Sequence, residues 1–321
     1  MDNPSPARLA TLRNAPGIRR LVFGAPTHPG GVPLLTDLSE VSKLPQLEEL
    51  DVWDNRLRDL TSLGSPVHLG KLGLHNSREL ESLSGLSRLS GLTDLDLNAG
   101  TADIAPVGEL EHLERLTLMG SELDLSPLAR LSALRTLDLY LGGHTDLAPL
   151  GSLIGLQNLA LRGSNASSYG ALAALTGIEV LDLGSRVPTL SFVSGMKKLR
   201  RIDVRNSPDL RDISPLGGHA ALVSLELEDT GVEDLTPLAS CSLLDRLGLA
   251  YTHVKTLAPL AGLGALRGIN LAGVPGLDLM PLAGLRNLMT VTLLPGQVAE
   301  AALARFRAAA PRGTLSFDSR R

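Results

Sequence analysis

Apolar and polar positions recur along this chain with a period of about 22 residues. Each period contains Leu-x-x-Leu-x-Leu or a close variant, as in LEELDV at 47–52 and LGKLGL at 69–74. The last three positions alternate strictly, which predicts a short strand with one buried face. The middle apolar residue recurs in steps of 21 to 23 residues, at Leu50, Leu72, Leu95, Leu116, Leu137, Leu159, Leu181, Ile202, Leu225, Leu247, Ile269 and Val291. A looser unit, IRRLVF, places Leu21 at the matching position.

A second motif occupies the other half of most units. It reads DLSPL at 124–128, DLAPL at 146–150 and DLTPL at 234–238, with several variants elsewhere. Proline fixes its own φ and cannot donate a backbone hydrogen bond, so the motif predicts a turn or short 3-10 segment on the opposite side from the strand. One unit cannot bury its leucines alone. Neighbouring units are therefore expected to stack, with their strands in a parallel sheet on the concave side.

These residues resemble the leucine-rich repeat superfamily, in particular its short class with the D-L-x-P-L motif. That class is similar to the bacterial internalins and to a phosphatase regulatory subunit. The resemblance covers about residues 15–295. It implies an α/β leucine-rich repeat solenoid with a curved parallel sheet on the concave face, short 3-10 or turn segments on the convex face and a capping helix at the C-terminus.

The expected organisation has three parts. Residues 1–46 form an N-terminal cap and a degenerate first repeat, 47–295 form about twelve repeats, and 296–321 form a C-terminal cap. In this cap GQVAEAALARFRAAAP reads as a helix, with one face formed by Val298, Ala302, Phe306 and Ala309, and TLSF adds a last strand. Residues 24–33, rich in Gly and Pro, are expected to be a loop.

The chain departs from the superfamily pattern in the turn that follows each strand. The superfamily usually places Asn three residues after the last strand leucine, and here only Asn55 fits. The other units have Ser77, Ser121, Ser164, Ser207, Thr230, Thr252, Gly100, Gly142, Gly296, Arg186 or Val274. Hydroxyls can make local hydrogen bonds of their own. Arg186 and Val274 cannot replace the amide, which predicts less regular structure at 184–190 and 272–277.

Two columns of side chains point away from the core, because alternate residues of a strand face opposite sides. The column between the last two leucines contains Asp51, Asp96 and Asp138, among small and polar residues. The next column contains Trp53, the only tryptophan, followed by His75, Met119, Tyr140, Arg162 and Arg205. Trp53 is therefore predicted to lie on the concave face.

Aromatic residues, Met and Arg are enriched in protein interfaces. We therefore expect a partner-binding site with Trp53, His75, Asp96, Met119 and Tyr140 at its centre, accompanied by Asp51 and Asp138 and flanked by Arg162 and Arg205. The alternative is that large side chains merely cover a long sheet face. The acidic column likewise has two interpretations: it steers a basic partner, or it is a solvated face balanced by neighbouring Lys and Arg.

The charge and the apolar runs of the chain argue against some classes of function. The net charge is -4 with Lys, Arg and acidic residues interspersed, which argues against a nucleic-acid or anionic-membrane partner. No apolar run suggests a signal peptide or a membrane span. A cytoplasmic, monomeric protein is the expectation.

Catalysis and metal binding find little support in the sequence. His219 and Cys241 occupy the same position in adjacent units, which could pair a nucleophile with a base. That position is otherwise filled by Leu and Met, so a core role is favoured. Asp182, Asp203 and Glu226 on consecutive strands could form a weak Ca²⁺ site, but Arg201 and Arg205 argue against it. We therefore expect no catalytic residues, no metal and no cofactor.

The sequence predicts a non-enzymatic module that binds a protein partner on its concave face. Two alternatives remain open at this point. One is a regulatory subunit that modulates a partner enzyme, and the other is a secreted or surface effector or adhesin like the internalins.

Overall fold

The computed structural model describes residues 17–24, 35–66, 68–100, 103–121, 123–143, 145–310 and 314–317. The chain divides into two compact units. The first comprises residues up to 156 together with 163–168, and the second comprises 157–162 together with the residues from 169 onward. The expected loop at 24–33 lies outside the described residues, apart from Gly24.

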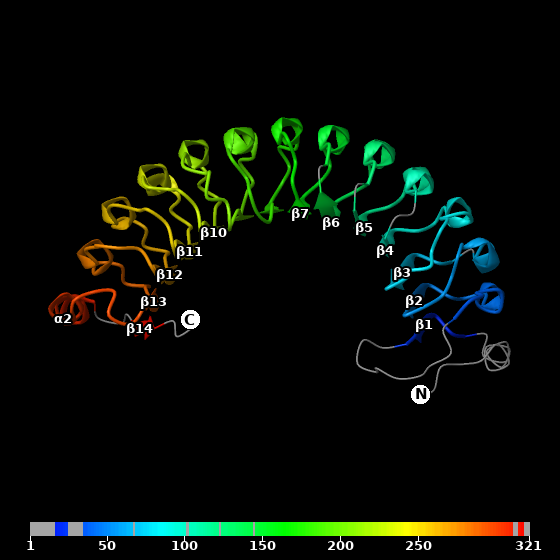
Figure 1. Ribbon diagram of the computed structural model, residues 1–321, viewed down its shortest axis with the longest axis horizontal. Coiled ribbons are helices and arrows are strands. Elements are labelled where there is room, and N and C mark those ends of the chain that lie inside the picture. The colour runs from blue at the N-terminus through cyan, green and yellow to red at the C-terminus, as the bar shows by residue number, and fades with distance from the viewer. Residues whose placement is uncertain are drawn as a thin grey trace. The chain divides into compact units, whose positions relative to one another are not determined.

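The described part of the first unit contains parallel strands at one strand per repeat (Figure 1). They are β1 (Arg20–Phe23), β2 (Glu49–Trp53), β3 (Lys71–His75), β4 (Asp94–Gly100), β5 (Arg115–Ser121) and β6 (Thr136–Gly143). The predicted register holds at the leucine positions, since Leu21 pairs with Leu50 and the series continues through Leu137; it shifts at the end of β4, between Asn98 and Gly100. The leucine spacing therefore fixes which residues are neighbours across the sheet.

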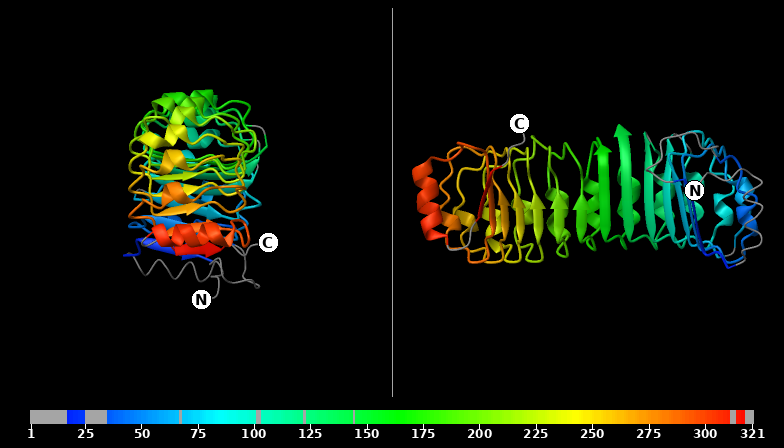
Figure 2. Two further views of the ribbon diagram at one scale, coloured as in Figure 1. Left: turned by 90° about the vertical axis from the view of Figure 1, so that its left-hand side faces the viewer. Right: turned by 90° about the horizontal axis from the view of Figure 1, so that it is seen from below.

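The second unit repeats this arrangement with shorter strands. They are β7 (Asn158–Ser164), which begins in this unit, β8 (Val180–Asp182), β9 (Arg201–Asp203), β10 (Ser224–Glu226), β11 (Arg246–Gly248), β12 (Gly268–Asn270), β13 (Thr290–Leu293) and β14 (Thr314–Phe317). The register again follows the predicted positions, from Leu159 with Leu181 to Val291 with Leu315. Figure 2 shows the strands of each unit side by side in one layer.

Short 3-10 segments form the layer opposite the strands, as the D-L-x-P-L motif predicts. In the first unit they are η2 (Val41–Lys43), η3 (Thr61–Leu63), η4 (Leu86–Arg88), η5 (Ala105–Glu109), η6 (Ser126–Arg130) and η7 (Ala148–Ser152). In the second unit they are η8 (Gly170–Ala174), η9 (Ser191–Gly195), η10 (Ser214–Leu216), η11 (Thr236–Ser240), η12 (Ala258–Leu260) and η13 (Met280–Leu282). In each unit the strands lie on the inner side of the bend and the 3-10 segments on the outer side (Figure 1).

The aspartate of the motif has a role that the sequence pattern did not reveal. Its carboxylate accepts a hydrogen bond from the backbone N–H two residues further on, for example Asp124 from Ser126 at 2.9 Å and Asp212 from Ser214 at 2.8 Å. This geometry is an Asx-turn, and it starts the 3-10 segment. Hydrogen bonds from the side chain and the backbone N–H of Ser126 lower the pKa of Asp124 below the ordinary value, and those from the backbone N–H and the side chain of Ser214 do the same for Asp212.

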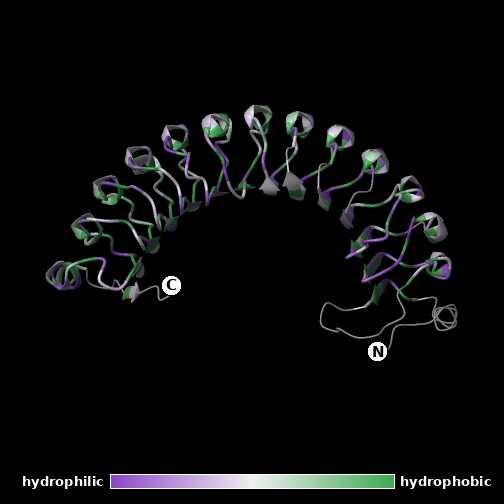
Figure 3. Ribbon diagram, in the orientation of Figure 1, coloured by the Kyte–Doolittle hydropathy of each residue, from purple (hydrophilic) through white to green (hydrophobic). Residues whose placement is uncertain are grey.

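The core lies between the two layers and is built almost entirely from the leucine positions of each repeat. Hydrophobic and polar residues alternate along each repeat (Figure 3). The C-terminal helix α2 (Glu300–Ala309) covers the end of the second unit with Leu303 and Phe306, which are buried. The predicted face was wrong in part, because Ala302 and Ala309 are exposed. None of the helices in the described ranges is long and apolar enough to cross a membrane.

Polar side chains form hydrogen bonds with backbone groups in the turns that follow the strands, as the hydroxyl-bearing residues at these positions suggested. Asn55 accepts from the backbone N–H of Leu57 at 3.2 Å and donates to Ser77 Oγ at 2.7 Å. Thr230 donates to a backbone carbonyl in its own turn, at 2.7 Å. At the Arg186 position the next repeat supplies the missing group, because Ser207 Oγ accepts from the N–H of Val187 at 3.0 Å.

At the Val274 position a glutamine from the C-terminal cap supplies the missing amide. Gln297 Oε1 accepts hydrogen bonds from the backbone N–H groups of Gly273 and Leu294, at 3.0 and 2.8 Å. Its Nε2 donates to the carbonyls of Leu271 and Val274, at 2.7 and 2.8 Å. One side chain therefore satisfies four backbone groups, and it joins the β12 turn to the cap.

Candidate functional site

The strand face of the first unit brings the predicted central residues together. Trp53 pairs with His75 across β2 and β3, and Met119 pairs with Tyr140 across β5 and β6. Asp96 of β4 lies between these pairs. All of these side chains are at least partly exposed, and Met119 is 40% exposed. Trp53 therefore lies on the sheet surface, as the sequence predicted.

Trp53 and His75 form a stacked pair. Their ring centroids are 3.9 Å apart and their planes differ by 20°. The two nitrogens of His75 point to carboxylates on either side: Nε2 lies 3.7 Å from Asp51 Oδ1, and Nδ1 lies 3.7 Å from Asp96 Oδ2. The imidazole is therefore held by an aromatic ring and by two acidic groups at once.

Gly73 makes room for this arrangement. It lies on β3 between Asp51 and Asp96 in the outward column. A Cβ at this position would lie 2.6 Å from His75 Nε2 and would overlap Asp51 Oδ1. Only glycine lets both side chains lean over the strand.

These residues line a cavity of about 340 Å³, which we call the aromatic pocket. Trp53 and His75 form one side, and Met119 and Tyr140 form the other. Asp96, Asn98 and Thr117 lie between the two sides, and Asn76 also contributes. The pocket has apolar and aromatic walls and one carboxylate from β4.

Asp96 is the electrostatic focus of the aromatic pocket. Burial raises the pKa of its carboxyl group; His75 opposes the shift, and the negative charge of Asp51 adds to it. Asp51 has a cation of its own, since Arg20 Nη2 lies 3.7 Å from Asp51 Oδ2. For Asp96, the described contact with a basic group is the one to His75.

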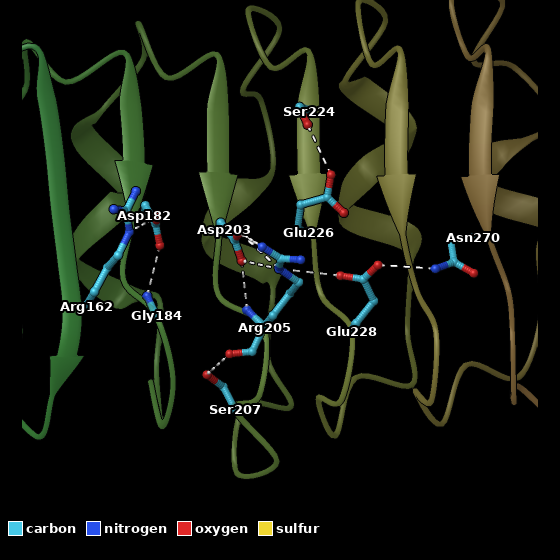
Figure 4. A network of polar contacts seen from close by, with 10 residues as sticks. All are labelled: Arg162, Asp182, Gly184, Asp203, Arg205, Ser207, Ser224, Glu226, Glu228 and Asn270. Carbon is cyan, nitrogen blue, oxygen red and sulfur yellow. Dashed lines mark hydrogen bonds and ion pairs between the residues drawn. The ribbon is translucent and has the colours of Figure 1, made fainter. Parts of the chain in front are cut away.

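The predicted flanking arginines lie in the second unit, where each forms ion pairs with its own neighbours (Figure 4). Arg162 Nε donates to Asp182 Oδ2 at 3.1 Å. Arg205 donates to both oxygens of Asp203, at 2.6 to 3.0 Å, and lies 3.7 Å from Glu228 Oε2. Their predicted place beside the central residues stays a prediction.

The acidic residues around Arg162 and Arg205 are not arranged to hold a metal ion, and no group of three or more His, Cys, Asp or Glu in the described part of the chain is. Asp182 and Asp203 are held by arginines, as the sequence analysis anticipated for Arg205. Burial raises the pKa of Glu226 and of Glu228, and in Glu226 the nearby charges of Glu228 and Asp203 raise it further. Asn270 donates to Glu228 Oε1 at 3.2 Å.

Cys241 and His219 are buried core residues. Cys241 Sγ lies 3.9 Å from the carbonyl oxygen of Leu216, and burial raises the pKa of the thiol. His219 Nδ1 lies 3.0 Å from the same carbonyl, and its Nε2 lies 3.1 Å from that of Val193. The imidazole is therefore engaged with backbone rather than with the thiol, which favours the core interpretation.

Sequence reasoning missed four contributors to the aromatic pocket: Gly73, Asn76, Asn98 and Thr117. Gly73, Asn98 and Thr117 stand in the outward columns, so strand alternation predicted the face on which they lie, and Asn76 follows β3 in the turn. Their importance depends on which side chains lean across a strand, and repeat spacing does not encode this.

Comparison with solved structures finds the same architecture. The chain is similar to the internalin InlF of Listeria monocytogenes, with a TM-score of 0.80 and 22% sequence identity over 97% of this chain and 89% of that one. It is similar to a leucine-rich repeat protein of Leptospira interrogans, with a TM-score of 0.75 and 18% identity over 98% and 93% of the two chains.

A further similarity is to TLR13, whose crystal structure is a complex with the single-stranded RNA ssRNA13. The TM-score is 0.74 at 21% identity, and the match covers 98% of this chain but 49% of that chain. No family model matches the chain, and no curated protein matches it in sequence. Together with the strand and 3-10 arrangement, these similarities show that the chain has the fold of a leucine-rich repeat solenoid.

Proposed function

We propose that this protein is a non-enzymatic binding module and that the strand face of its first unit binds a protein partner. The observation that carries the proposal is the aromatic pocket, where Trp53, Met119 and Tyr140 line a cavity of about 340 Å³ on the strand face. Such side chains dominate the energetics of protein interfaces when a partner covers them. The hydrogen-bonded sheet that carries them is ordered in advance, so association immobilises little backbone.

A protein partner is favoured over a nucleic acid, although TLR13 is a leucine-rich repeat structure in complex with RNA. In β2 to β6 the two outward columns that carry the aromatic pocket contain Asp51, Asp96 and Asp138 and no Lys or Arg. Lys71 and Arg115 stand in the neighbouring outward column, where Arg115 forms an ion pair with Asp94. Phosphate groups would meet carboxylates there, whereas nucleic-acid binding relies on basic side chains. The proposal includes no catalytic step, because Cys241 and His219 are buried in the core.

The test is a crosslinked pull-down from the native cell with the wild type and the double variant Trp53→Ala/Tyr140→Ala. A matched control is Leu243→Ala/Met289→Ala, which removes exposed apolar side chains (54% and 60% exposed) from the second unit. We expect a partner that the wild type and the control capture and that the pocket variant loses. Equal capture by all three proteins would place the binding site elsewhere and contradict the proposal.

The captured partner also decides whether the module regulates an enzyme. If the partner is an enzyme, its activity is measured with and without this protein. A change in that activity would support the regulatory interpretation, and unchanged activity would support simple binding.

A further inference from the structure

The second unit shows how this repeat neutralises an outward aspartate. In β9 the sequence Ile202-Asp203-Val204-Arg205 places an arginine two residues after the aspartate, on the same face of the strand. Arg205 donates to both carboxylate oxygens of Asp203, at 2.6 to 3.0 Å (Figure 4). In β9 the guanidinium group is therefore the counterion of the outward aspartate.

In β4 the corresponding sequence is Leu95-Asp96-Leu97-Asn98. By position in the repeat, Leu95 corresponds to Ile202, so Asp96 corresponds to Asp203 and Asn98 to Arg205. Asn98 carries no charge, and the described basic contact of Asp96 is His75 at 3.7 Å. Burial of Asp96 and the nearby charge of Asp51 both disfavour its ionised form, which raises its pKa.

The surroundings of Asp96 are those that a guanidinium group prefers. Tyr140 offers an aromatic ring on one side, and His75, stacked on Trp53, forms the other side; planar cations are attracted to aromatic faces. Met119, 40% exposed, offers a polarisable surface for an aliphatic side-chain stem. A guanidinium is planar and more weakly hydrated than an ammonium, so arginine suits such a site better than lysine.

We propose that the aromatic pocket binds an arginine side chain of the partner, with Asp96 as the counterion and with Tyr140 and the stacked His75–Trp53 pair as the walls. This inference rests on the proposed function, because the arginine belongs to the protein partner proposed there. The partner supplies to Asp96 the group that Arg205 supplies to Asp203 within the second unit.

Trp53 allows a direct test, because it is the only tryptophan of the chain and its emission reports on the pocket alone. The probe is N-acetyl-arginine amide, titrated at constant ionic strength. The matched controls are the uncharged isostere N-acetyl-citrulline amide and N-acetyl-lysine amide. We expect a saturable change in Trp53 emission with the arginine probe in the range of about 1 to 50 mM, as suits a single side chain. Citrulline amide should bind at least about tenfold more weakly, since it lacks the charge.

Two variants sharpen the test. Asp96→Asn should weaken binding of the arginine probe about tenfold, whereas Asp209→Asn, which removes the same charge from an exposed site in the second unit, should leave it unchanged. Asn98→Arg recreates the β9 arrangement, so the protein's own guanidinium should occupy the pocket. This variant should abolish both probe binding and partner capture.

Several outcomes would overturn the inference: no saturable change with the arginine probe, equal binding of citrulline amide, or undiminished partner capture by Asn98→Arg. If the probe fails while Trp53→Ala/Tyr140→Ala still loses the partner, the proposed function stands and only the arginine assignment fails. If the probe binds while that double variant still captures the partner, the pocket assignment stands and the proposed function fails.

Discussion

The carboxylate of Asp51 leans across Gly73, so that an added Cβ at Gly73 would overlap Asp51 Oδ1 and lie 2.6 Å from His75 Nε2. Gly73→Ala should therefore displace both side chains and disturb the stacked Trp53–His75 pair. The overlapping atoms are the ends of flexible side chains, so the free energy of unfolding should change by no more than about 1 kcal/mol. Tryptophan emission and urea unfolding measure the two effects separately.

A matched control for Gly73→Ala is Gly268→Ala, in which the new methyl group meets nothing within 4 Å. This variant should leave tryptophan emission unchanged. If Gly73→Ala also leaves the emission and the partner capture of the wild type intact, Gly73 is not needed for the geometry of the pocket.

Gln297→Ala should destabilise the C-terminal end of the second unit. The side chain satisfies four backbone groups, and its removal leaves them to find other partners. We expect a loss of about 2 to 3 kcal/mol in the free energy of unfolding, because unsatisfied buried polar groups are costly. Hydrogen exchange should show the greatest loss of protection in the β12 turn and α2. Gln157→Ala, at an exposed position, is the control and should be nearly neutral.

Glu226→Gln should stabilise the second unit near neutral pH. Burial raises the pKa of Glu226 in the folded protein above its ordinary value, so ionisation costs stability above the raised pKa. That cost is absent at about pH 4, where the carboxyl is largely protonated in both states, and the advantage of Gln should disappear there. The gain should be below about 1 kcal/mol because the group is partly solvated.

Glu233→Gln is a control for which the expected change in the free energy of unfolding has the opposite sign. Lys255 lowers the pKa of Glu233, so the glutamate favours the folded state above its ordinary pKa and this contribution is lost as the pH falls. Urea unfolding at both pH values measures each variant. A Glu226→Gln protein that is less stable than the wild type at neutral pH would contradict the burial argument.

Cys241 should be inert in the folded protein. The thiol is buried and burial raises its pKa, so little reactive thiolate reaches solvent. Labelling by a soluble thiol reagent should be at least about a hundredfold slower than in urea, because it requires local opening. Fast labelling with a pH dependence in the folded state would instead revive a nucleophilic role for the Cys241–His219 pair.

The repeat spacing predicted most of the fold. Leu50, Leu72 and the later members of the series pair as expected, because each repeat has to bury the same positions against its neighbours. The 3-10 segments also follow from the local motif. The Asx-turn of Asp124 was not predicted, because the conformation of the proline in the motif was sufficient to predict a turn.

Other features could not be predicted from the sequence, because they depend on contacts between distant segments. Gln297 reaches a turn 23 residues earlier, and nothing in its own segment indicates that target. The buried face of α2 was misjudged because its alanines and Leu303 offer several helical faces, and docking selects one of them. For the site, strand alternation predicted that Trp53 and Tyr140 are exposed, but not the cavity between them.

The strand lengths set a limit on how a partner can bind. Strands β2 to β6 contain five to eight residues each, so at ordinary strand dimensions their face covers on the order of 500 Å². A standard protein interface buries about 800 Å² on each partner. A partner centred on Trp53 and Tyr140 therefore has to reach past the ends of these strands, and the loops there can differ between related proteins and change the choice of partner while the centre stays the same.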